Sequence, residues 1–565
     1  MLKYFIIPIK EYRKPALLTA VFMLAAVLLE VTVPFLMVGI VDYGITPGDM
    51  EATWRRGGVL IGASLTSLTF GLFSGIFLAK SSAGFAKSLR NHMYSQINEF
   101  SFKNLDKLTT GALVTRLTTD VTALQTAFSS ILRICTRSPF MLTFSLIMAF
   151  YINSSLAWIF VLVVPVLGMA MYFIIRTAFP LYKLALKKYD ELNVLVQENF
   201  KAIKIVKSFV REDYEKAKFG EASKDIQDIF TKTLKIVALF NPITQFAIYV
   251  CMILIAWFGA GLLVVEDMTM GELMSFIIYI NQILFSMIMI GMLFVTIAMS
   301  RASAERIAEI FSEIPDMKIP DNPGEIVDGR IDFENVSFGY TDKYVLENVN
   351  LSINHGETVG ILGGTGSSKT TLVQLIPRLY DVSQGVLKVG GVNVKDLDLT
   401  ALRDKISIVL QKNTLFEGTV SQNLRWAGDV SDDEIINACK MAKAHDFIMA
   451  MGGYETHIEQ GGTNLSGGQR QRLCIARAIL KKPYIIIFDD STSSVDTTTE
   501  NFILNSIKEM VKGTKLIISQ RISSVQFADK IILMDNKQIL AQGTHSELMT
   551  NKVYQEIYDS QTKNY

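Results

Sequence analysis

Six long apolar segments fill the first 300 residues of the chain, and they constrain its fold more than any other feature. Each segment is close to the ~20 residues that an α-helix needs to cross the hydrocarbon core of a bilayer. The sequence therefore predicts a membrane domain with six spans. The spans run approximately over residues 16–41, 59–82, 128–150, 156–175, 236–265 and 271–299.

The whole chain is too long for one domain and too apolar to be wholly soluble, since half of its 565 residues are hydrophobic. Its formal net charge of +1 offers no case for nucleic acid as a partner. The cysteines have neither the spacing of metal ligands nor that of a disulfide framework, so we expect them to be reduced and packed in helices. They are Cys135, Cys251, Cys439 and Cys474.

Basic residues indicate how the spans are oriented. Lysine and arginine concentrate in two long connectors, residues 83–127 and 182–235, which the positive-inside rule places in the cytoplasm. Residues 1–14 mix aromatic and basic side chains, as in a helix that lies in the membrane interface and is not a cleaved signal. We therefore expect a multi-pass protein of the cell membrane whose two termini are both cytoplasmic.

The two connectors are too long for turns, and their apolar periodicity favours helices that continue the spans over solvated loops. Residues 102–116 and 207–212 are the segments expected to touch a soluble domain. That domain follows a cluster of proline and glycine at residues 315–324, where regular structure is interrupted. From residue 331 onward, short β-like runs alternate with helical ones, which is typical of an α/β domain.

A phosphate-binding loop is predicted at residues 363–370, GGTGSSKT, because a strand pattern precedes it and an apolar helix pattern follows it. In such a loop the backbone amides surround the phosphates, Lys369 reaches the outer ones and the Thr370 hydroxyl binds Mg²⁺. Ser368 stands where glycine is usual. A positive φ at this residue would cost about 1 kcal/mol or more.

Two further motifs follow along the chain, LSGGQ at residues 465–469 with RQR behind it and YIIIFDD at residues 484–490. Together with the phosphate loop they resemble the ATP-binding cassette (ABC) family, and the six spans extend the resemblance to a half-transporter of the exporter type. The resemblance implies a six-helix transmembrane domain of the ABC exporter type, followed by an α/β P-loop nucleotide-binding domain with an antiparallel β subdomain and a helical subdomain. The expected divisions are an interfacial elbow helix (1–14), the transmembrane domain (15–300), a linker (301–330) and the cassette domain (331–565).

The resemblance also implies that ATP and Mg²⁺ are ligands, and it gives roles to single residues. Tyr340 would stack on adenine, the alternative being a buried strand tyrosine. Gln411 would contact Mg²⁺ and relay the nucleotide state to the membrane domain, while Asp489 and Thr370 would also hold the ion. The implied ATP ligands are Tyr340, Gly363, Gly364, Thr365, Gly366, Ser367, Ser368, Lys369, Thr370 and Thr371, with Ser466, Gly467, Gly468 and Gln469 on the surface presented to a second cassette.

Asp490, Gln520 and Gln411 form the expected catalytic centre, and the first two depart from the family pattern. Asp490 replaces the glutamate that polarises the attacking water and is one methylene shorter. A displacement of ~1 Å can cost ~100-fold in rate, and loss of a general base costs ~100-fold to ~10,000-fold. Gln520 replaces the histidine that senses the γ-phosphate, and an amide has no proton to titrate. We expect a site that binds ATP and hydrolyses it slowly. The alternative is that Asp490 and Gln520 catalyse hydrolysis adequately.

A slow site beside an intact LSGGQ motif predicts a non-identical partner. In the family each ATP lies between one chain's phosphate loop and the other chain's LSGGQ. This chain would therefore complete the site of a second half-transporter that carries the glutamate and the histidine. Asp496 would either couple the two sites or cap a helix. The alternatives to this pairing are a homodimeric lipid or drug exporter and an ATP-gated channel or regulatory subunit.

The expected substrate is a hydrophobic or amphipathic small molecule, with membrane lipid around the spans. Charges at membrane depth usually face water or a partner, so Glu30 and the pair Arg133 and Arg137 are candidates for a cavity. The two arginines share one helical face and would otherwise snorkel at the cytoplasmic edge. The sixth span carries a soft and aromatic set that either lines an adaptable cavity or simply packs. The set comprises Met274, Phe276, Tyr279, Gln282, Phe285, Met287, Met289 and Met292.

Overall fold

The computed structural model of the chain describes residues 3–317, 320, 322–491 and 496–562, and it divides into two compact units. The first unit comprises Met1–Asn98 and Thr110–Glu313. The second comprises Glu99–Thr109 and Ile314–Tyr565. A short piece of the N-terminal half thus belongs to the C-terminal unit.

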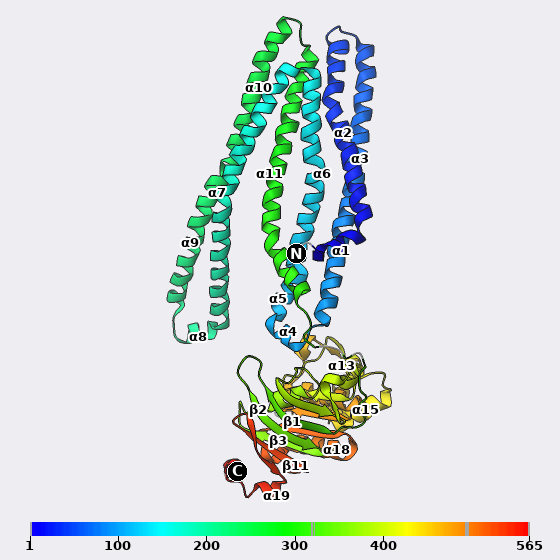
Figure 1. The fold of residues 1–565 in the computed structure, drawn as a ribbon, viewed down its shortest axis with the longest axis vertical. Helices are drawn as coiled ribbons and strands as arrows, with labels where there is room; N and C mark the ends of the chain where they lie inside the picture. Colours follow the sequence, from blue (N-terminus) through cyan, green and yellow to red (C-terminus); the bar gives the residue numbers. More distant parts are fainter. Residues whose placement is uncertain (1–2, 318–319, 321, 492–495, 563–565) are drawn as a thin grey trace. The chain divides into compact units, whose positions relative to one another are not determined.

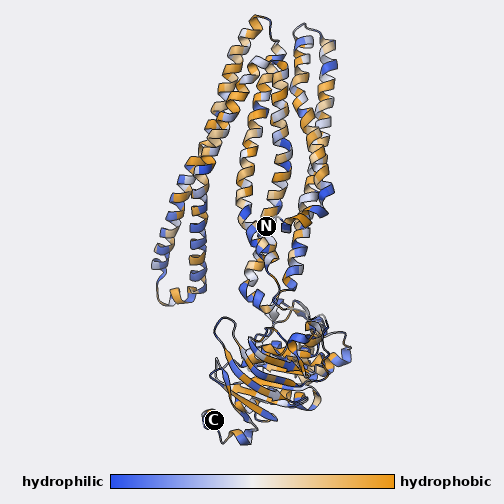
Figure 2. Cartoon of the chain, viewed as in Figure 1, coloured by the Kyte–Doolittle hydropathy of each residue, from blue (hydrophilic) through white to orange (hydrophobic). Residues whose placement is uncertain are grey.

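Within its described residues, the first unit consists of helices joined by short turns, with no strand (Figure 1). Six of its helical segments are long and apolar enough to cross a membrane, which confirms the predicted number of spans. Hydrophobic residues dominate one end of these helices, and hydrophilic residues dominate their extensions toward the other end (Figure 2). The helices that carry the spans are α2 (Arg13–Ile40), α3 (Met50–Asn98), α6 (Val121–Ile152), α7 (Ser154–Lys201), α10 (Phe240–Val264) and α11 (Met270–Ser312).

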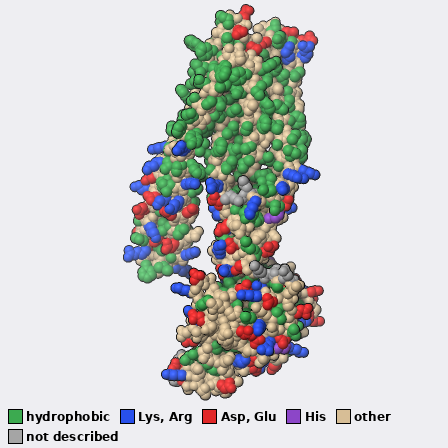
Figure 3. Space-filling model, viewed as in Figure 1, with side chains coloured by type: hydrophobic (Ala, Val, Ile, Leu, Met, Phe, Trp, Pro, Cys, Tyr) green, Lys and Arg blue, Asp and Glu red, His purple; other side chains and the backbone are tan. Residues whose placement is uncertain are grey.

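Helices, and not solvated loops, occupy the long connectors. The space-filling view shows a broad hydrophobic surface on the spans, with Lys, Arg, Asp and Glu gathered on the extensions (Figure 3). This distribution is what a bilayer as solvent requires of the lipid-facing surface. The remaining helical segments of this unit are α1 (Lys3–Glu11), η1 (Val41–Ile45), α5 (Thr110–Thr115), η2 (Arg116–Asp120), α8 (Ile203–Ser208) and α9 (Glu212–Ala238).

The packing of the spans shows which residues of the sixth span are buried, and so distinguishes core packing from a cavity lining for some of them. Phe276 and Tyr279 are fully buried, and the ring of Phe276 stacks on that of Phe160 with centroids 5.9 Å apart. The Tyr279 hydroxyl donates to the carbonyl oxygen of Val31 at 2.9 Å. These two side chains therefore pack between helices and do not line a cavity. Other members of the set stay exposed, namely Met274, Phe285 and Met292.

The membrane-depth charges fall into two different environments. Arg137 Nη2 on α6 donates to both carboxylate oxygens of Glu30 on α2, at 2.8 Å each. Gln282 on α11 supports the pair by donating to the Glu30 carbonyl oxygen at 3.2 Å. Arg133 lies one turn from Arg137 on α6 and is exposed. The two arginines thus share a helix face, as expected, but only Arg137 is part of this ion pair.

Among its described residues, the second unit contains two large sheets and one small one. The antiparallel sheet has the order β2-β1-β4-β5, and the larger sheet has the order β12-β11-β3-β10-β9-β6. In the larger sheet the strands from β11 to β6 are parallel, and β12 is antiparallel to β11. The strands are β1 (Ile331–Phe338), β2 (Leu346–Ile353), β3 (Thr358–Gly363), β4 (Gln384–Val389), β5 (Val392–Asn393), β6 (Ile406–Val409), β7 (Gly418–Thr419), β8 (His457–Ile458), β9 (Ile485–Asp489), β10 (Thr514–Ser519), β11 (Lys530–Asp535) and β12 (Gln538–Gly543).

Three central strands explain where a site can form. β3, β9 and β10 are buried at every residue, as expected for parallel strands covered on both faces. Their shared register pairs Leu362 with Ser519 and Ile518 with Asp489, so the carboxyl ends of all three strands meet at one edge. Open α/β sheets bind ligands at this edge.

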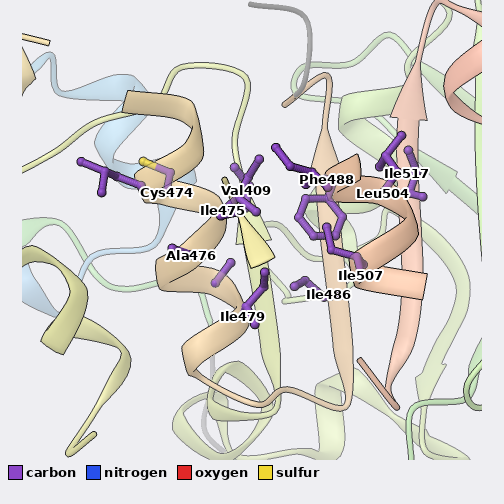
Figure 4. Packing of buried hydrophobic residues seen from close by; sticks show 14 of the residues in the cluster. Val409, Cys474, Ile475, Ala476, Ile479, Ile486, Phe488, Leu504, Ile507 and Ile517 are labelled. Atoms are coloured by element: carbon purple, nitrogen blue, oxygen red, sulfur yellow. The ribbon is translucent and has the colours of Figure 1, made fainter. Parts of the chain in front are cut away.

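Helices cover the sheets and complete the core. Ile475 and Ile479 of α17 (Gly467–Leu480) and Leu504 and Ile507 of α18 (Thr497–Met510) pack with Phe488 of β9 in one buried cluster (Figure 4). The other helical segments of this unit are α4 (Phe102–Lys107), α12 (Lys369–Leu375), η3 (Val394–Asp396), α13 (Leu399–Asp404), α14 (Val420–Leu424), η4 (Arg425–Ala427), α15 (Asp432–Met441), α16 (His445–Ala450), η5 (Gln460–Gly462), η6 (Ile522–Ser524), α19 (His545–Leu548) and α20 (Lys552–Thr562).

Helix α4 is the part of the first connector that packs within the second unit. Its N-terminal residue Ser101 caps it in a reciprocal pair with Asn104. Tyr380 donates its hydroxyl to Asp106 Oδ2 at 2.7 Å, and its ring lies 6.2 Å from that of Phe102. Of the segment 102–116 that was expected to touch the soluble domain, α4 belongs to the second unit, whereas α5 and η2 belong to the helical unit.

Candidate nucleotide-binding site

The phosphate loop joins the end of β3 to the start of α12. Gly366 has φ +83° and Ser368 has φ +67°, so both lie in the left-handed region. The positive φ whose cost was considered for Ser368 is therefore observed. A left-handed non-glycine residue costs on the order of 1–3 kcal/mol and persists where its surroundings hold it, as they do between a buried strand and a helix.

Lys369 is buried at the base of this loop. Its Nζ donates to the carbonyl oxygens of Gly363 and Gly364 at 2.7 Å each and to Ser367 Oγ at 3.2 Å. Desolvation lowers the pKa of Lys369, and the carboxylates of Asp490 and Asp489 oppose that shift. The loop thus holds one ammonium group beside the space that a phosphate would enter.

Asp489 supplies the acidic group that the sequence assigned to Mg²⁺. Its Oδ1 accepts from Thr370 Oγ1 at 2.9 Å, while its buried Oδ2 has no hydrogen-bond partner among the described residues. Burial raises the pKa of Asp489, the Thr370 hydrogen bond opposes the shift, and the neighbouring charge of Asp490 adds to it. A buried carboxylate oxygen that lacks a partner, beside a hydroxyl, fits a hard cation with oxygen ligands.

These groups line one pocket of about 310 Å³. Asp490 lies there with φ +47°, and its backbone amide donates to the Ile518 carbonyl at 3.1 Å. Gln520 follows the adjacent strand β10 and is exposed. The predicted residues that line the pocket are Thr365, Gly366, Ser367, Ser368, Lys369, Thr370, Thr371, Gln411, Asp489, Asp490 and Gln520.

The pocket also contains residues that the motifs did not single out. Ile518 and Ser519 end the strand next to β3, so the parallel pairing alone places them there. Val345 precedes β2, and its amide donates to the Phe338 carbonyl at 2.8 Å. No local sequence signal marks Val345, because its position depends on the pairing of β1 with β2.

Tyr340 lies beside the pocket lining. Its hydroxyl is 3.2 Å from Thr371 Oγ1, and its ring meets those of Phe338 and Tyr380 edge to face at 5.0 and 5.1 Å. The residue follows β1 and is 44% exposed, so it is not a buried strand tyrosine. An aromatic ring that is exposed and fixed by two others is suited to stacking on a base.

The LSGGQ motif occupies a separate surface of the same unit. Ser466 caps α17 in a reciprocal pair with Gln469, whose side-chain oxygen accepts from the Ser466 amide at 2.9 Å. Ser466 and Gly467 are exposed, and Leu465 is buried beneath them. Ser466, Gly467, Gly468 and Gln469 do not line the phosphate pocket.

Asp496 has a local role that the structure makes explicit. Its side chain accepts from the Thr499 amide at 2.9 Å and caps α18. This backbone bond is also the leading reason why the pKa of Asp496 is lowered. Helix capping, one of the two roles considered for this residue, is therefore observed.

Comparison with known proteins identifies two family regions. Residues 17–287 match the ABC transporter transmembrane region, and residues 346–493 match the ABC transporter model. The chain is 33% identical over 558 residues to the uncharacterized ABC transporter ATP-binding protein YfiB of Bacillus subtilis, with 98% of this chain and 97% of that protein covered. It is 33% identical over 479 residues to the ATP-dependent lipid A-core flippase of Syntrophus aciditrophicus, with 82% and 78% covered.

A solved structure shows the same fold. The structure of a bacterial Atm1-family ABC exporter with ATP bound matches with a TM-score of 0.82 and 24% identity, covering 98% of this chain and 99% of that one. The predicted fold class, six membrane helices followed by an α/β nucleotide-binding domain, is confirmed. The transmembrane region and the nucleotide-binding region lie on one polypeptide. This chain therefore belongs to the ABC transporter family as a half-transporter of the exporter type.

Proposed function

We propose that this chain is one half of a heterodimeric ABC exporter that moves amphipathic or hydrophobic compounds out of the cell, and that its own ATP site hydrolyses slowly. The observation that carries the proposal is the composition of the phosphate pocket. Asp490 and Gln520 line it together with Lys369 and Asp489, at the two positions where the family uses glutamate and histidine.

The chain's own residues would bind nucleotide well. Lys369 and the loop amides meet the phosphates, and Thr370, Asp489 and Gln411 are the residues that would hold Mg²⁺. When bound, Mg²⁺ neutralises charge on the phosphate oxygens. Tyr340 would fix the adenine.

Proton removal is the step expected to fail. The Asp490 carboxylate must accept the proton of the attacking water, and its shorter side chain starts from a backbone that β10 holds at Ile518. A strand end fixed by a neighbouring strand cannot advance to replace the missing methylene. Gln520 can donate a hydrogen bond to a phosphate oxygen but cannot supply a charge.

The exposed LSGGQ surface supports a role toward a partner. Ser466 offers a hydroxyl, and Gly467 and Gly468 offer amides at the N-terminus of a fourteen-residue helix, which favours an anion. A partner with a phosphate loop, glutamate and histidine would gain a complete site from this surface. ATP binding at both sites would draw the cassettes together and shift the membrane helices between inward and outward access.

The proposed setting is the cell membrane, with the cassette and both termini in the cytoplasm. The basic connectors, now seen as helical extensions, support this orientation through the positive-inside rule. An amphipathic substrate is supported by the exposed Met274, Phe285 and Met292 on α11, and a relative of this chain is named as a lipid flippase.

The decisive experiment purifies the chain alone and together with the second half-transporter that co-purifies from native membranes, and measures ATP turnover in both samples. We expect little turnover from the chain alone and substantial turnover from the pair. In the pair, Ser466→Ala should reduce turnover strongly, because it acts at the fast site, whereas Asp490→Asn should change it little.

The opposite pattern would assign the chain to a homodimeric lipid or drug exporter. In that case the chain alone turns ATP over rapidly and Asp490→Asn abolishes the activity. Conductance across a bilayer without accumulation of any compound would instead favour the ATP-gated channel.

A further inference from the structure

A pocket of about 490 Å³ lies between α7 and α11 in the helical unit. Tyr172, Arg176, Phe179 and Lys183 line it from α7, and Phe294 lines it from α11. Three aromatic rings and two cationic side chains thus contribute to a lining that is otherwise aliphatic, and none of its lining residues is acidic.

Both cations are held against rings of their own helix. The Arg176 guanidinium lies 6.0 Å from the centre of the Tyr172 ring and donates to the Tyr172 hydroxyl at 3.3 Å. The Lys183 ammonium lies 5.0 Å from the centre of the Phe179 ring. In the described part of the chain neither group forms an ion pair with a carboxylate. Two positive charges on one helix face thus point to an anion that the chain itself does not provide.

A second pocket of about 460 Å³ adjoins the first and shares Ile175, Phe179 and Val295 with it. Its lining comes from α7, α9, α10 and α11 and is largely apolar, with Thr233, Asn241 and the Tyr182 hydroxyl as the polar groups. A cationic compartment and an apolar compartment therefore meet at three shared side chains.

The depth of the cations matches a membrane interface. Arg176 lies roughly 33 Å along α7 from Ser154, at ~1.5 Å per residue. The hydrocarbon core of a bilayer is about 30 Å thick. Arg176 is therefore near the membrane face opposite the turn between α6 and α7, where α7 becomes hydrophilic (Figure 2).

We propose that these two pockets form a binding site for an anionic phospholipid of that leaflet, with the phosphate between Arg176 and Lys183 and an acyl chain in the apolar pocket. This inference rests on the proposed export function and names anionic amphiphiles as its substrate class. Inorganic phosphate would leave the apolar pocket unused, and a cationic amphiphile would meet two like charges.

The test measures lipid binding by the full chain in detergent, without ATP, after equilibration with equal amounts of phosphatidylglycerol and phosphatidylcholine. Native mass spectrometry counts the bound lipids. We expect phosphatidylglycerol to be preferred, and the double variant Arg176→Gln, Lys183→Gln to lose roughly 10- to 30-fold of that preference. Lys187→Gln is the matched control, because Lys187 lies one turn further along α7 and lines neither pocket.

Two further variants separate charge, shape and folding. The exchange Arg176→Lys, Lys183→Arg keeps both charges and should keep the preference. Gly291 lines the apolar pocket, so Gly291→Leu should weaken binding of long-chain more than of short-chain phosphatidylglycerol, whereas Gly261→Leu in open space should not.

Equal binding of the two lipids by the unchanged chain would overturn the proposal, and so would a preference that survives the double glutamine variant. Displacement of phosphatidylglycerol by millimolar inorganic phosphate would also contradict it, because the acyl chain would then add nothing. Since no ATP is present, these outcomes are independent of whether the chain works in a heterodimer.

Discussion

At the scale of single residues, the phosphate pocket combines groups that are well placed with groups that are chemically weak. Lys369, Thr370 and Asp489 are joined to the loop and to one another by short hydrogen bonds. Asp490 and Gln520 line the same pocket. The proposed roles in binding and in hydrolysis thus fall on different residues, so substitutions can test them separately.

Lengthening Asp490 should restore hydrolysis at this site. Asp490→Glu supplies the missing methylene, so we expect single-turnover hydrolysis at the chain's own site to rise by tens of fold to ~100-fold. The rate is measured in the purified pair after the partner's catalytic glutamate has been replaced by glutamine. Asp535→Glu, at the exposed end of β11, is the control. An unchanged rate would mean that side-chain length is not the defect.

Removing the Thr370 hydroxyl should remove the dependence of ATP binding on Mg²⁺. Thr370→Val removes the donor to Asp489 Oδ1, so that neither carboxylate oxygen is bonded by a side chain, at a cost of about 1–3 kcal/mol. We expect a lower melting temperature and an ATP affinity that is nearly the same in Mg²⁺ and in EDTA. Thr370→Ser keeps the hydroxyl and should behave like the unchanged chain. A Thr370→Val variant that still responds fully to Mg²⁺ would contradict the assignment.

At the scale of elements, two connections link parts of the chain that are far apart in sequence. Helix α4 follows α3 directly in the chain but packs on Tyr380 of the second unit. In the spans, α2 and α6 are joined by the Glu30 and Arg137 pair. The first connection ties α4 to the second unit, and the second joins two helices of the membrane domain.

Tyr380→Phe should weaken coupling more than folding. The change removes the 2.7 Å bond to Asp106 but keeps the ring that contacts Phe102 and Phe338, so we expect a stability loss of only about 1 kcal/mol. Stimulation of ATP turnover by transported compounds should fall, while unstimulated turnover persists. Tyr454→Phe, which loses a bond to His445, is the control and should leave stimulation intact. Equal stimulation in both variants would sink the idea.

The Glu30 and Arg137 pair should show coupling in a double-mutant cycle. Glu30→Gln and Arg137→Gln each leave one charge uncompensated within the spans, whereas the double variant leaves none, so we expect a coupling of about 1–2 kcal/mol. Melting temperatures of the full chain in detergent provide the four values. The pair Lys216 and Asp213, which is largely exposed on α9, should show no measurable coupling. Additive losses at Glu30 and Arg137 would show that the bond contributes nothing.

At the scale of the whole molecule, the two halves of the chain fold in different solvents: the first half in the bilayer and the second in water. The number of spans and the α/β class of the soluble half follow from local patterns, because span length is set by bilayer thickness and buried parallel strands need continuous apolar runs. The phosphate loop is equally local, since the five consecutive residues 364–368 between β3 and α12 define its shape. These features could be predicted without any knowledge of distant contacts.

Local sequence patterns do not show which residues far apart in the chain come into contact. Thr370 and Asp489 are 119 positions apart, and Arg137 and Glu30 are 107 positions apart. Val345 lines the pocket because of how the strands pair. Phe276 and Tyr279 are buried in the core of the spans and do not line a cavity. Which faces meet depends on the packing of whole elements, so these assignments required the folded chain.

The sequence by itself determined the six spans, the α/β cassette, the phosphate loop and the two unusual residues at its catalytic positions. Only the tertiary structure decided that residues 99–109 join the second unit, that Arg137 is paired while Arg133 is exposed, and that two pockets adjoin between α7 and its neighbours. The physical reason is the distance along the chain over which each kind of interaction acts. Hydrophobic length and loop chemistry act between neighbours in the chain, whereas ion pairs, pockets and unit boundaries arise where distant helix faces and strand ends come together.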